Sequence, residues 1–367
     1  MRAAVYHGVR DVRIADVPVP EPAAGEVLLK VLATGICGTD ASEWAYGPVQ
    51  FPSEVRHPAT GHLGPIVIGH EFAGEVVATG PGVDPGWQGK LVASCGAVSC
   101  GRCWQCERGR TNLCVSYAGV GLHRDGALAH YVATPVANCE AVEDLGLTPD
   151  AAALGQPMSI AVHTRTRGRA APGERALVLG TGGIGAMLVY ALAAHGCDVT
   201  VVEPNPERAE LASRLGAHRI GPATGPVGEL LAVMPGPPHV VFEASGVAAV
   251  ARRAFEVLPK GGRLVQIGVQ KQPIEVDMAR LTLTELEIIG TNALVRGDDF
   301  RTALELVAGR AEGWADVAPT AIPLDALVAD GLAPLAEGRP AAIKTLVDPW
   351  AATARPADTT PRQERAR

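Results

Sequence analysis

Four cysteines in the run CGRCWQCERGRTNLC have the spacing C-x2-C-x2-C-x7-C, and they are Cys100, Cys103, Cys106 and Cys114. Four thiolates this close in sequence can close a tetrahedral shell around one Zn²⁺, and a closed shell leaves no position for a substrate. The run therefore predicts a structural zinc in a lobe of about residues 95–115. Buried or disulfide-paired cysteines are the alternative, but two-residue gaps strain neighbouring disulfides.

A second group of potential metal ligands lies upstream. GICGTD carries Cys37, and GHEFAGEVVATG carries the adjacent pair His70 and Glu71. Catalytic zinc sites commonly use three protein ligands of mixed N, S and O type and keep one position for water or substrate. Each dipeptide alone is weak evidence, but together Cys37, His70 and Glu71 predict a catalytic zinc site.

The segment RALVLGTGGIGAMLVYALAAHGCDVTVVEP is typical of a strand, a glycine turn, an apolar helix and a second strand. Gly180, Gly182 and Gly185 supply G-x-G-x-x-G. The first permits the tight turn, the second lets the backbone approach a pyrophosphate, and the third lets helix and strand pack closely. With Gly183 and Ile184 inside the turn, the helix amides would hold the phosphates. The segment predicts a dinucleotide site.

Glu203 ends the second strand of this unit. A carboxylate there accepts hydrogen bonds from the adenosine ribose hydroxyls and repels the 2′-phosphate of NADP. Arg208, five residues on, could invite that phosphate or lie over the ribose edge. We give the acid more weight, so the predicted cofactor is NAD.

With these three motifs in this order, the chain resembles the zinc-containing medium-chain alcohol dehydrogenase family from about Met1 to about Pro349. The resemblance implies a GroES-like catalytic domain with a Rossmann domain inserted near its end. It also places Cys37, His70 and Glu71 on the catalytic zinc ligands and the four clustered cysteines on the structural-zinc lobe. Hydride transfer between a secondary alcohol and nicotinamide is the implied reaction.

The chain departs from that family at two positions. Gln156, in ALGQPMSIAVHT, stands where the branch usually has a glutamate beside the zinc, and its carbonyl oxygen could ligate the metal or hold its water. Ser42 stands where relatives often carry a proton-shuttle histidine. Thr39 falls on the proton-relay hydroxyl, and Asp40 falls on the acid that orients His70. A less anionic shell should strengthen the Lewis acid.

The long connection between Cys37 and His70 resembles the butanediol and polyol dehydrogenase branch, so a vicinal diol such as 2,3-butanediol is the expected substrate. A sugar alcohol is the nearest alternative. Residues near Trp44, Tyr46 and Leu294 should shape the pocket. A zinc-free quinone or enoyl reductase would lack the cysteine lobe, and a zinc-stabilised binding protein without activity would not need the mixed ligand set.

Composition excludes other classes. The 367 residues carry a formal net charge of −7, which gives no electrostatic reason to bind nucleic acid or an anionic membrane. No apolar run approaches the roughly 20 residues of a membrane helix. The N-terminal stretch predicts neither secretion nor organelle import. Metal-type cysteine spacing suits a reducing cytosol. Cys95, Cys139 and Cys197 are read as small apolar residues, with Cys95 near enough to the lobe to compete for metal.

The predicted fold class is α/β, with a GroES-like β-rich catalytic domain and a doubly wound Rossmann domain. The expected boundaries are 1–157 for the catalytic domain, 158–294 for the Rossmann domain and 295–350 for a return to the first domain. DDFRTALELVAGR predicts an amphipathic helix and AAIKTLVDP a last strand. Residues 351–367 are polar, contain proline and lack apolar periodicity, and are predicted to be a disordered tail. The family resemblance implies a homodimer or homotetramer.

Overall fold

The computed structural model describes residues 1–362. The chain folds into two compact units. The first combines Met1–Ser159 with the chain from Leu294 onward, and the second is Ile160–Ala293. The first division falls inside helix α4, Gly155–Arg167.

The first unit is built on an eight-stranded sheet with the order β10-β6-β5-β3-β18-β17-β19, and β9 also pairs with β3. Smaller sheets of order β2-β1-β4 and β7-β8 accompany it. The strands are β1 (Arg2–Gly8), β2 (Asp11–Asp16), β3 (Glu26–Gly35), β4 (Ile66–Val67), β5 (Glu71–Thr79), β6 (Leu91–Ser94), β7 (Ala97–Val98), β8 (Ala118–Gly119), β9 (Tyr131–Pro135), β10 (Cys139–Ala141), β17 (Thr320–Pro323), β18 (Leu346–Asp348) and β19 (Arg355–Pro356).

Short helices connect these strands. The α-helices are α1 (Gly38–Tyr46), α2 (Trp104–Glu107), α3 (Pro149–Ala153), α10 (Asp298–Ala308) and α11 (Ala333–Ala336). Alternate residues of β3, among them Val27, Leu29 and Val31, are fully buried. They pack with Phe72 and Val76 of β5 into one core cluster, because the period of a strand places every second side chain on the same face. The antiparallel pairing of β3 and β5 is what brings Gly35 opposite Glu71.

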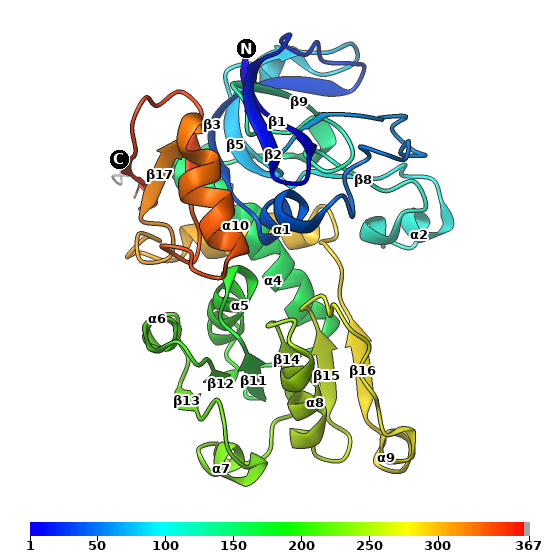
Figure 1. Cartoon of the computed structure of the whole chain (residues 1–367), viewed down its shortest axis with the longest axis vertical. Helices are drawn as coiled ribbons and strands as arrows, with labels where there is room; N and C mark the ends of the chain where they lie inside the picture. The colour runs from blue at the N-terminus through cyan, green and yellow to red at the C-terminus, as the bar shows by residue number, and fades with distance from the viewer. Residues whose placement is uncertain (363–367) are drawn as a thin grey trace. The chain divides into compact units, whose positions relative to one another are not determined.

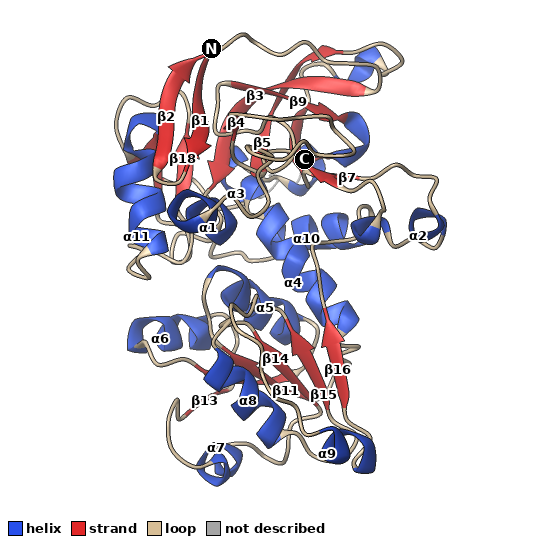
Figure 2. Cartoon of the chain, turned by 45° about the vertical axis from the view of Figure 1, so that its right-hand side comes forward, coloured by secondary structure: helices blue, strands red, loops and turns tan. Residues whose placement is uncertain are grey.

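The second unit is a six-stranded sheet of order β13-β12-β11-β14-β15-β16 in which every pair is parallel. Figure 2 shows these strands in red with helices packed along them. The elements are β11 (Arg175–Leu179), α5 (Gly183–Ala194), β12 (Asp198–Val202), α6 (Pro206–Arg214), β13 (Arg219–Gly221), α7 (Val227–Ala232), β14 (Val240–Glu243), α8 (Ala248–Val257), β15 (Arg263–Gln266), α9 (Met278–Leu283) and β16 (Glu287–Gly290). Strand order reverses between β11 and β14, as in a doubly wound fold (Figure 1).

The prediction of a disordered tail is wrong for residues 351–362. β19 pairs antiparallel with β17, and the Thr359 side chain is 1% exposed. The Arg355 guanidinium donates to both oxygens of Asp150, at 2.6 and 2.9 Å. The polar composition of this segment hides its buried acidic partner, which lies 205 residues away in sequence. The remainder of the predicted tail, 363–367, lies outside the described residues.

Within residues 1–362, no helix combines the length and apolar character needed to span a bilayer.

Candidate active site

Cys37, His70 and Glu71 meet in the first unit. Each offers a ligand atom, and these atoms all lie within 4.8 Å of one another. Cys37 follows the end of β3 and caps α1, while Glu71 starts β5 directly after His70. A Cβ on Gly35 would lie 2.3 Å from Glu71 Oε2, so only glycine leaves room for this carboxylate. The three residue types and their separation fit a zinc ion.

Asp40 orients His70. The imidazole Nδ1 lies 3.4 Å from Asp40 Oδ1, while Asp40 Oδ2 accepts a hydrogen bond of 2.9 Å from the Cys37 amide. The separation of Nδ1 and Oδ1 is an ion-pair distance, and neither of these two buried atoms has a hydrogen-bond partner among the described residues. With Nδ1 turned toward the acid, Nε2 is the nitrogen available to a metal, as is common in zinc-binding histidines. Burial alone lowers the pKa of His70, but the charges of Asp40 and Cys37 raise that pKa well above its usual value.

Lys344 is a buried cation beside the same group, and no role was predicted for it from the sequence. Its Nζ donates to Glu71 Oε1 at 2.8 Å, to Oε2 at 2.7 Å and to the Ile36 carbonyl at 3.2 Å. Both side chains are at most 4% exposed. Burial alone would lower the pKa of Lys344, but the charges of Glu71 and Cys37 raise it. A lone lysine inside the apolar run AAIKTLVDP was the available signal.

Thr39 lies close to the candidate ligands, with its Oγ1 3.7 Å from Cys37 Sγ. Ser42, on the same helix, is exposed. Gln156 lies in the first turn of α4 and is partly buried, and its backbone carbonyl accepts a hydrogen bond from Ser159. The role of the Gln156 side chain toward the metal therefore stays a prediction.

The four clustered cysteines also converge, with their sulfur atoms within 4.8 Å of one another. Cys103 Sγ lies 3.5 Å from Cys106 Sγ and 3.9 Å from Cys114 Sγ. The backbone amides of Cys106 and Val115 lower the pKa of Cys103 to about 6, which favours the thiolate that binds metal. The pKa of Cys100 is also lowered, chiefly by a hydrogen bond from the backbone amide of Arg102. Desolvation raises the pKa of Cys106 to about 11.

Cys95, Cys139 and Cys197 lie outside this four-sulfur cluster and are all buried. Burial raises the pKa of Cys95 to about 11, which disfavours its thiolate. The geometry therefore gives the lobe four candidate ligands and leaves Cys95 out.

The glycine turn joins β11 to α5 in the second unit. Gly180 has φ +92°, and a Cβ on Gly185 would lie 2.1 Å from the Gly180 carbonyl oxygen. A Cβ on Gly182 would meet no atom within 4 Å, so the backbone is open on that side. Gly182 caps α5 without a side-chain acceptor, which leaves the first amides of the helix, at Gly183 and Ile184, for a ligand. The turn fits a pyrophosphate.

Glu203 follows β12 and is 9% exposed. Its Oε2 accepts hydrogen bonds from the Thr181 amide at 2.9 Å and from the Thr181 hydroxyl at 3.0 Å, and Oε1 accepts from the Asn205 amide at 3.0 Å. The carboxylate is thus anchored to the glycine turn. Arg208 lies in the first turn of α6, where its amide is capped by Asn205 Oδ1.

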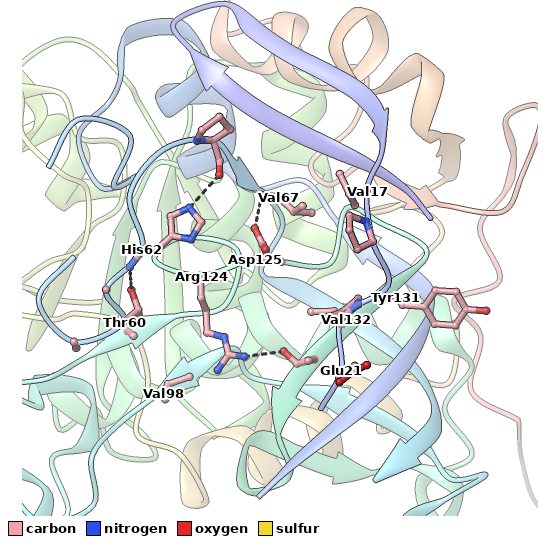
Figure 3. Close-up of a pocket in the computed structure, with 18 of the residues that line it drawn as sticks. Val17, Glu21, Thr60, His62, Val67, Val98, Arg124, Asp125, Tyr131 and Val132 are labelled. Carbon is pink, nitrogen blue, oxygen red and sulfur yellow. Dashed lines mark hydrogen bonds between the residues drawn. The ribbon is translucent and has the colours of Figure 1, made fainter. Parts of the chain in front are cut away.

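A cavity of about 1200 Å³ lies elsewhere in the first unit (Figure 3). Arg124 points into it and pairs with Glu26 at 2.6 Å, while His62 Nε2 lies 3.0 Å from the Pro65 carbonyl oxygen. Cys100 lines this cavity, but Cys37, His70 and Glu71 do not. It is therefore separate from the candidate metal group.

Comparison with known proteins decides the family. The profile for the alcohol dehydrogenase GroES-like domain matches residues 23–144, and the profile for the zinc-binding dehydrogenase matches residues 183–309. An L-threonine 3-dehydrogenase of Streptomyces avermitilis is 34% identical over 83% of this chain and 86% of its own length. The chain belongs to the zinc-binding alcohol dehydrogenase family. This confirms the predicted α/β fold of GroES-like and Rossmann domains, and it makes the chain a dehydrogenase.

Other relatives differ in the substrates that their names give. Sorbitol dehydrogenase of Bacillus subtilis is 32% identical over 82% of this chain and 85% of its own length. The crystal structure of 2R,3R-butanediol dehydrogenase from Bacillus subtilis superposes with a TM-score of 0.86 at 28% identity and covers 95% of this chain and 99% of that one. The names support the polyol and butanediol branch without fixing a substrate.

Two similar structures contain a nicotinamide cofactor. One, from Escherichia coli CFT073, is complexed with NADH, at a TM-score of 0.82, 26% identity and coverage of 95% and 99% of the two chains. The other, a zinc-binding dehydrogenase from Sinorhizobium meliloti, is bound to NADP with the same TM-score and coverage at 28% identity. The cofactors of this family member are therefore zinc and a nicotinamide dinucleotide.

Proposed function

We propose that this enzyme interconverts a secondary alcohol, preferably a vicinal diol, and the corresponding ketone, with NAD as the hydride acceptor. The observation that carries the proposal is the convergence of the partly buried Cys37 with the buried His70 and Glu71 beside Lys344. In this assignment Cys37, His70 and Glu71 hold the catalytic zinc. Cys100, Cys103, Cys106 and Cys114 hold the structural zinc.

The chain's own residues then have defined tasks. The zinc and the nicotinamide supply, when bound, a Lewis acid for the alcohol oxygen and an acceptor for the hydride. Asp40 fixes the His70 ring so that Nε2 faces the metal. Thr39 Oγ1, near the Cys37 sulfur, takes the alcohol proton. The open backbone at Gly182 and the anchored Glu203 carboxylate hold the pyrophosphate and the ribose.

The charge around the proposed metal is low. Lys344 donates to both oxygens of Glu71 and so neutralises that carboxylate, and Gln156 adds no charge. Cys37 is left as the anionic ligand, close enough to Lys344 to raise the pKa of that lysine. Such a shell leaves more positive charge on the metal, which lowers the pKa of a bound alcohol.

The choice of NAD over NADP rests on Glu203, whose carboxylate repels a 2′-phosphate. Wild-type enzyme should have the higher kcat/KM with NAD, by roughly ten- to hundred-fold, and Glu203→Ser should narrow that margin. A wild-type preference for NADP would overturn this assignment and point to Arg208.

A substrate panel tests the proposal directly. We expect kcat/KM with NAD to be highest for a 2,3-butanediol stereoisomer, lower for sorbitol and xylitol, and lowest for ethanol, because a second oxygen can bind a polar neighbour of the metal. A sugar alcohol ranking first would favour the second candidate, a polyol dehydrogenase, which the likeness to sorbitol dehydrogenase supports. Ethanol ranking first would refute the diol assignment.

Metal ligation is tested by Cys37→Ser, with Cys197→Ser as the matched control because Cys197 is buried outside both cysteine groups. Cys37→Ser should lose turnover and one zinc per chain while NAD binding persists. Unchanged zinc content and rate would refute the ligand assignment. We also propose a cytosolic enzyme that forms a homodimer or homotetramer, which light scattering on the purified protein would check.

A further inference from the structure

Glu243, the last residue of β14, is a fully buried carboxylate whose hydrogen-bond donors are all uncharged. Oε1 accepts hydrogen bonds from the Ser245 amide at 2.8 Å, from the Ser245 hydroxyl and from the Gly246 amide at 3.1 Å. Oε2 accepts from Gln266 Nε2 at 2.6 Å and from Gln270 Nε2 at 3.0 Å. Oε2 also accepts from the Gly246 amide at 3.3 Å. The carboxylate thus links the loop of residues 244–247 after β14 to the end of β15 and to the loop of residues 267–270 that follows it.

The two loops also touch each other. A Cβ on Gly268 would lie 2.2 Å from the Gly246 amide nitrogen and 2.8 Å from Glu243 Oε2. A Cβ on Gly246 would lie 3.1 Å from the Val269 carbonyl oxygen. The Glu243 carbonyl accepts the amides of Ile267 and Gly268, both at 2.9 Å. The spacing of the loops therefore depends on the carboxylate between them.

The loops lie where a parallel sheet binds its ligand. β14 stands between β11 and β15 in the sheet (Figure 1), and the strand order reverses beside it. A Cβ on Gly180, the first glycine of the turn, would lie 3.1 Å from Ser245 Cβ, so loop 244–247 borders that turn. Val247 and Val269, one on each loop, are 51% and 87% exposed. These two exposed apolar side chains lie on the loops that follow the carboxyl ends of β14 and β15.

A buried carboxylate without a cation lowers the stability of the fold, since its desolvation is offset only by neutral donors. We infer that Glu243 is a positioning residue for the nicotinamide dinucleotide: without contacting the cofactor, its two oxygens hold the two loops at the spacing that the cofactor needs.

Three variants test this inference. Glu243→Gln turns one oxygen into an amide nitrogen that cannot accept, yet it can fold, because Gln270 Oε1 is buried without a partner and can accept from the new amide. Gln266→Leu removes one donor without changing the charge. Glu256→Gln, on an exposed position of α8, is the control for loss of the same charge.

The first readout is the dissociation constant of NAD⁺, measured by titration calorimetry on the full chain. Glu243→Gln and Gln266→Leu should each raise it about ten-fold, as expected for losing a hydrogen bond to a charged group. The double variant should raise it by less than the product of the two, because both changes break one link. Glu256→Gln should stay within about two-fold of the wild-type value.

The second readout is amide hydrogen exchange, which separates positioning from general support of the fold. Residues 245–247 and 267–270 should exchange faster in both variants while β11 and β12 keep wild-type protection. Unchanged NAD⁺ affinity with both loops protected as in the wild type would overturn the inference, as would equal acceleration in β11 and β12. If Glu243→Gln fails to fold, Gln266→Leu alone decides. If the wild-type enzyme does not bind NAD⁺ at all, the cofactor assignment is refuted instead.

Discussion

At the scale of single residues, the candidate metal site contains a buried ion pair beside Cys37 and His70. Glu71 and Lys344 are 1% and 4% exposed and bind each other through two hydrogen bonds. Removing one partner of such a pair leaves the other charge buried and unpaired, which costs more than the pair itself contributes. The pair therefore holds Glu71 in place beside Cys37 and His70.

Lys344→Met tests this dependence. The variant should lose about 3–5 kcal/mol of unfolding free energy, measured by urea denaturation, because Glu71 would remain buried without a cation. Its content of catalytic zinc should also change, because Glu71 would no longer be held in place, and metal analysis would detect this change. Lys260→Met, at an exposed position, should stay close to wild type.

The double variant Lys344→Met with Glu71→Gln sharpens the result. It should recover part of the lost free energy, because the uncompensated charge is gone. A single variant as stable as the wild type, or a double variant whose loss is the simple sum of the two single losses, would contradict the coupling.

Residue type and order were enough to predict the site only where the residue types themselves are known metal ligands. Cys37, His70 and Glu71 could be found because thiolate, imidazole and carboxylate are metal ligands, and they do converge. Lys344 could not be found, because its partner Glu71 lies 273 residues away, while the nearer acid, Asp348, binds Arg355 instead. Glu243 was missed for a related reason, since its donors Gln266 and Gln270 lie 23 and 27 residues away and are brought to it by the pairing of β14 with β15.

At the scale of elements, the cysteine lobe has little regular structure to support it. Between β7 and β8 it contains only α2, of four residues, and a three-residue 3₁₀ turn, Thr111–Leu113. So little secondary structure buries few apolar groups, and a bound metal can replace that missing stability.

Cys103→Ser should therefore lower the zinc content from two ions per chain to one and reduce the melting temperature by several degrees, since metal binding contributes directly to folding. Turnover measured below that temperature should change little. Cys197→Ser is the control. A variant with two zinc ions and the melting temperature of the wild type would rule out a structural zinc in the lobe.

A histidine contact ties the segment of residues 57–62 to the turn after β8. The rings of His57 and His123 stack with centroids 4.3 Å apart, and the Thr60 hydroxyl donates to the His123 carbonyl at 2.7 Å. His123 Nδ1 accepts the Gly119 amide at 2.9 Å. Burial, with a smaller effect of His57, lowers the pKa of His123 to about 4.

This contact should make stability depend on pH. Between the ordinary histidine pKa and about 4, the unfolded chain binds a proton at His123 that the folded chain does not, so the free energy of unfolding falls as the pH falls. His123→Phe keeps a stacking ring but cannot titrate, and its stability should decline less over that range. Urea denaturation at several pH values measures the slope, with His7→Phe, at an exposed position, as the control. Equal slopes for His123→Phe and wild type would contradict the assignment.

Periodicity predicted the elements well where one pattern dominates. The predicted amphipathic helix in DDFRTALELVAGR is α10, and the glycine turn joins a strand to a helix. The last strand was predicted over AAIKTLVDP, but the observed strand is shorter, since β18 spans only Leu346–Asp348. The residues just before β18 are held by backbone hydrogen bonds, from the Lys344 amide to the Val317 carbonyl and from the Ile36 amide to the Thr345 carbonyl, both at 3.0 Å. The Lys344 ion pair with Glu71 holds them as well, which a local pattern cannot show.

At the scale of the whole molecule, the chain closes its first unit with a segment that composition alone marks as a tail. Arg355 joins three distant parts of that unit, since its guanidinium binds Asp150 in α3 and Asp348 at the end of β18 while its strand pairs with β17. The Thr148 hydroxyl also donates to the Asp358 carbonyl. Polar residues can thus be structural when their partners are buried acids, which low hydropathy does not reveal.

Arg355→Met tests whether this closure stabilises the unit. The Asp150 side chain is 3% exposed and would keep only the Asp358 amide, at 2.7 Å, of its present donors. We expect a loss of about 2–3 kcal/mol in unfolding free energy, because a buried acceptor would lose its charged partner. Asp150→Asn added to Arg355→Met should recover part of it. Arg339→Met, whose side chain is 78% exposed, should change little. If Arg355→Met unfolds at the wild-type urea concentration, the C-terminal segment contributes nothing to the stability of the unit despite its contacts.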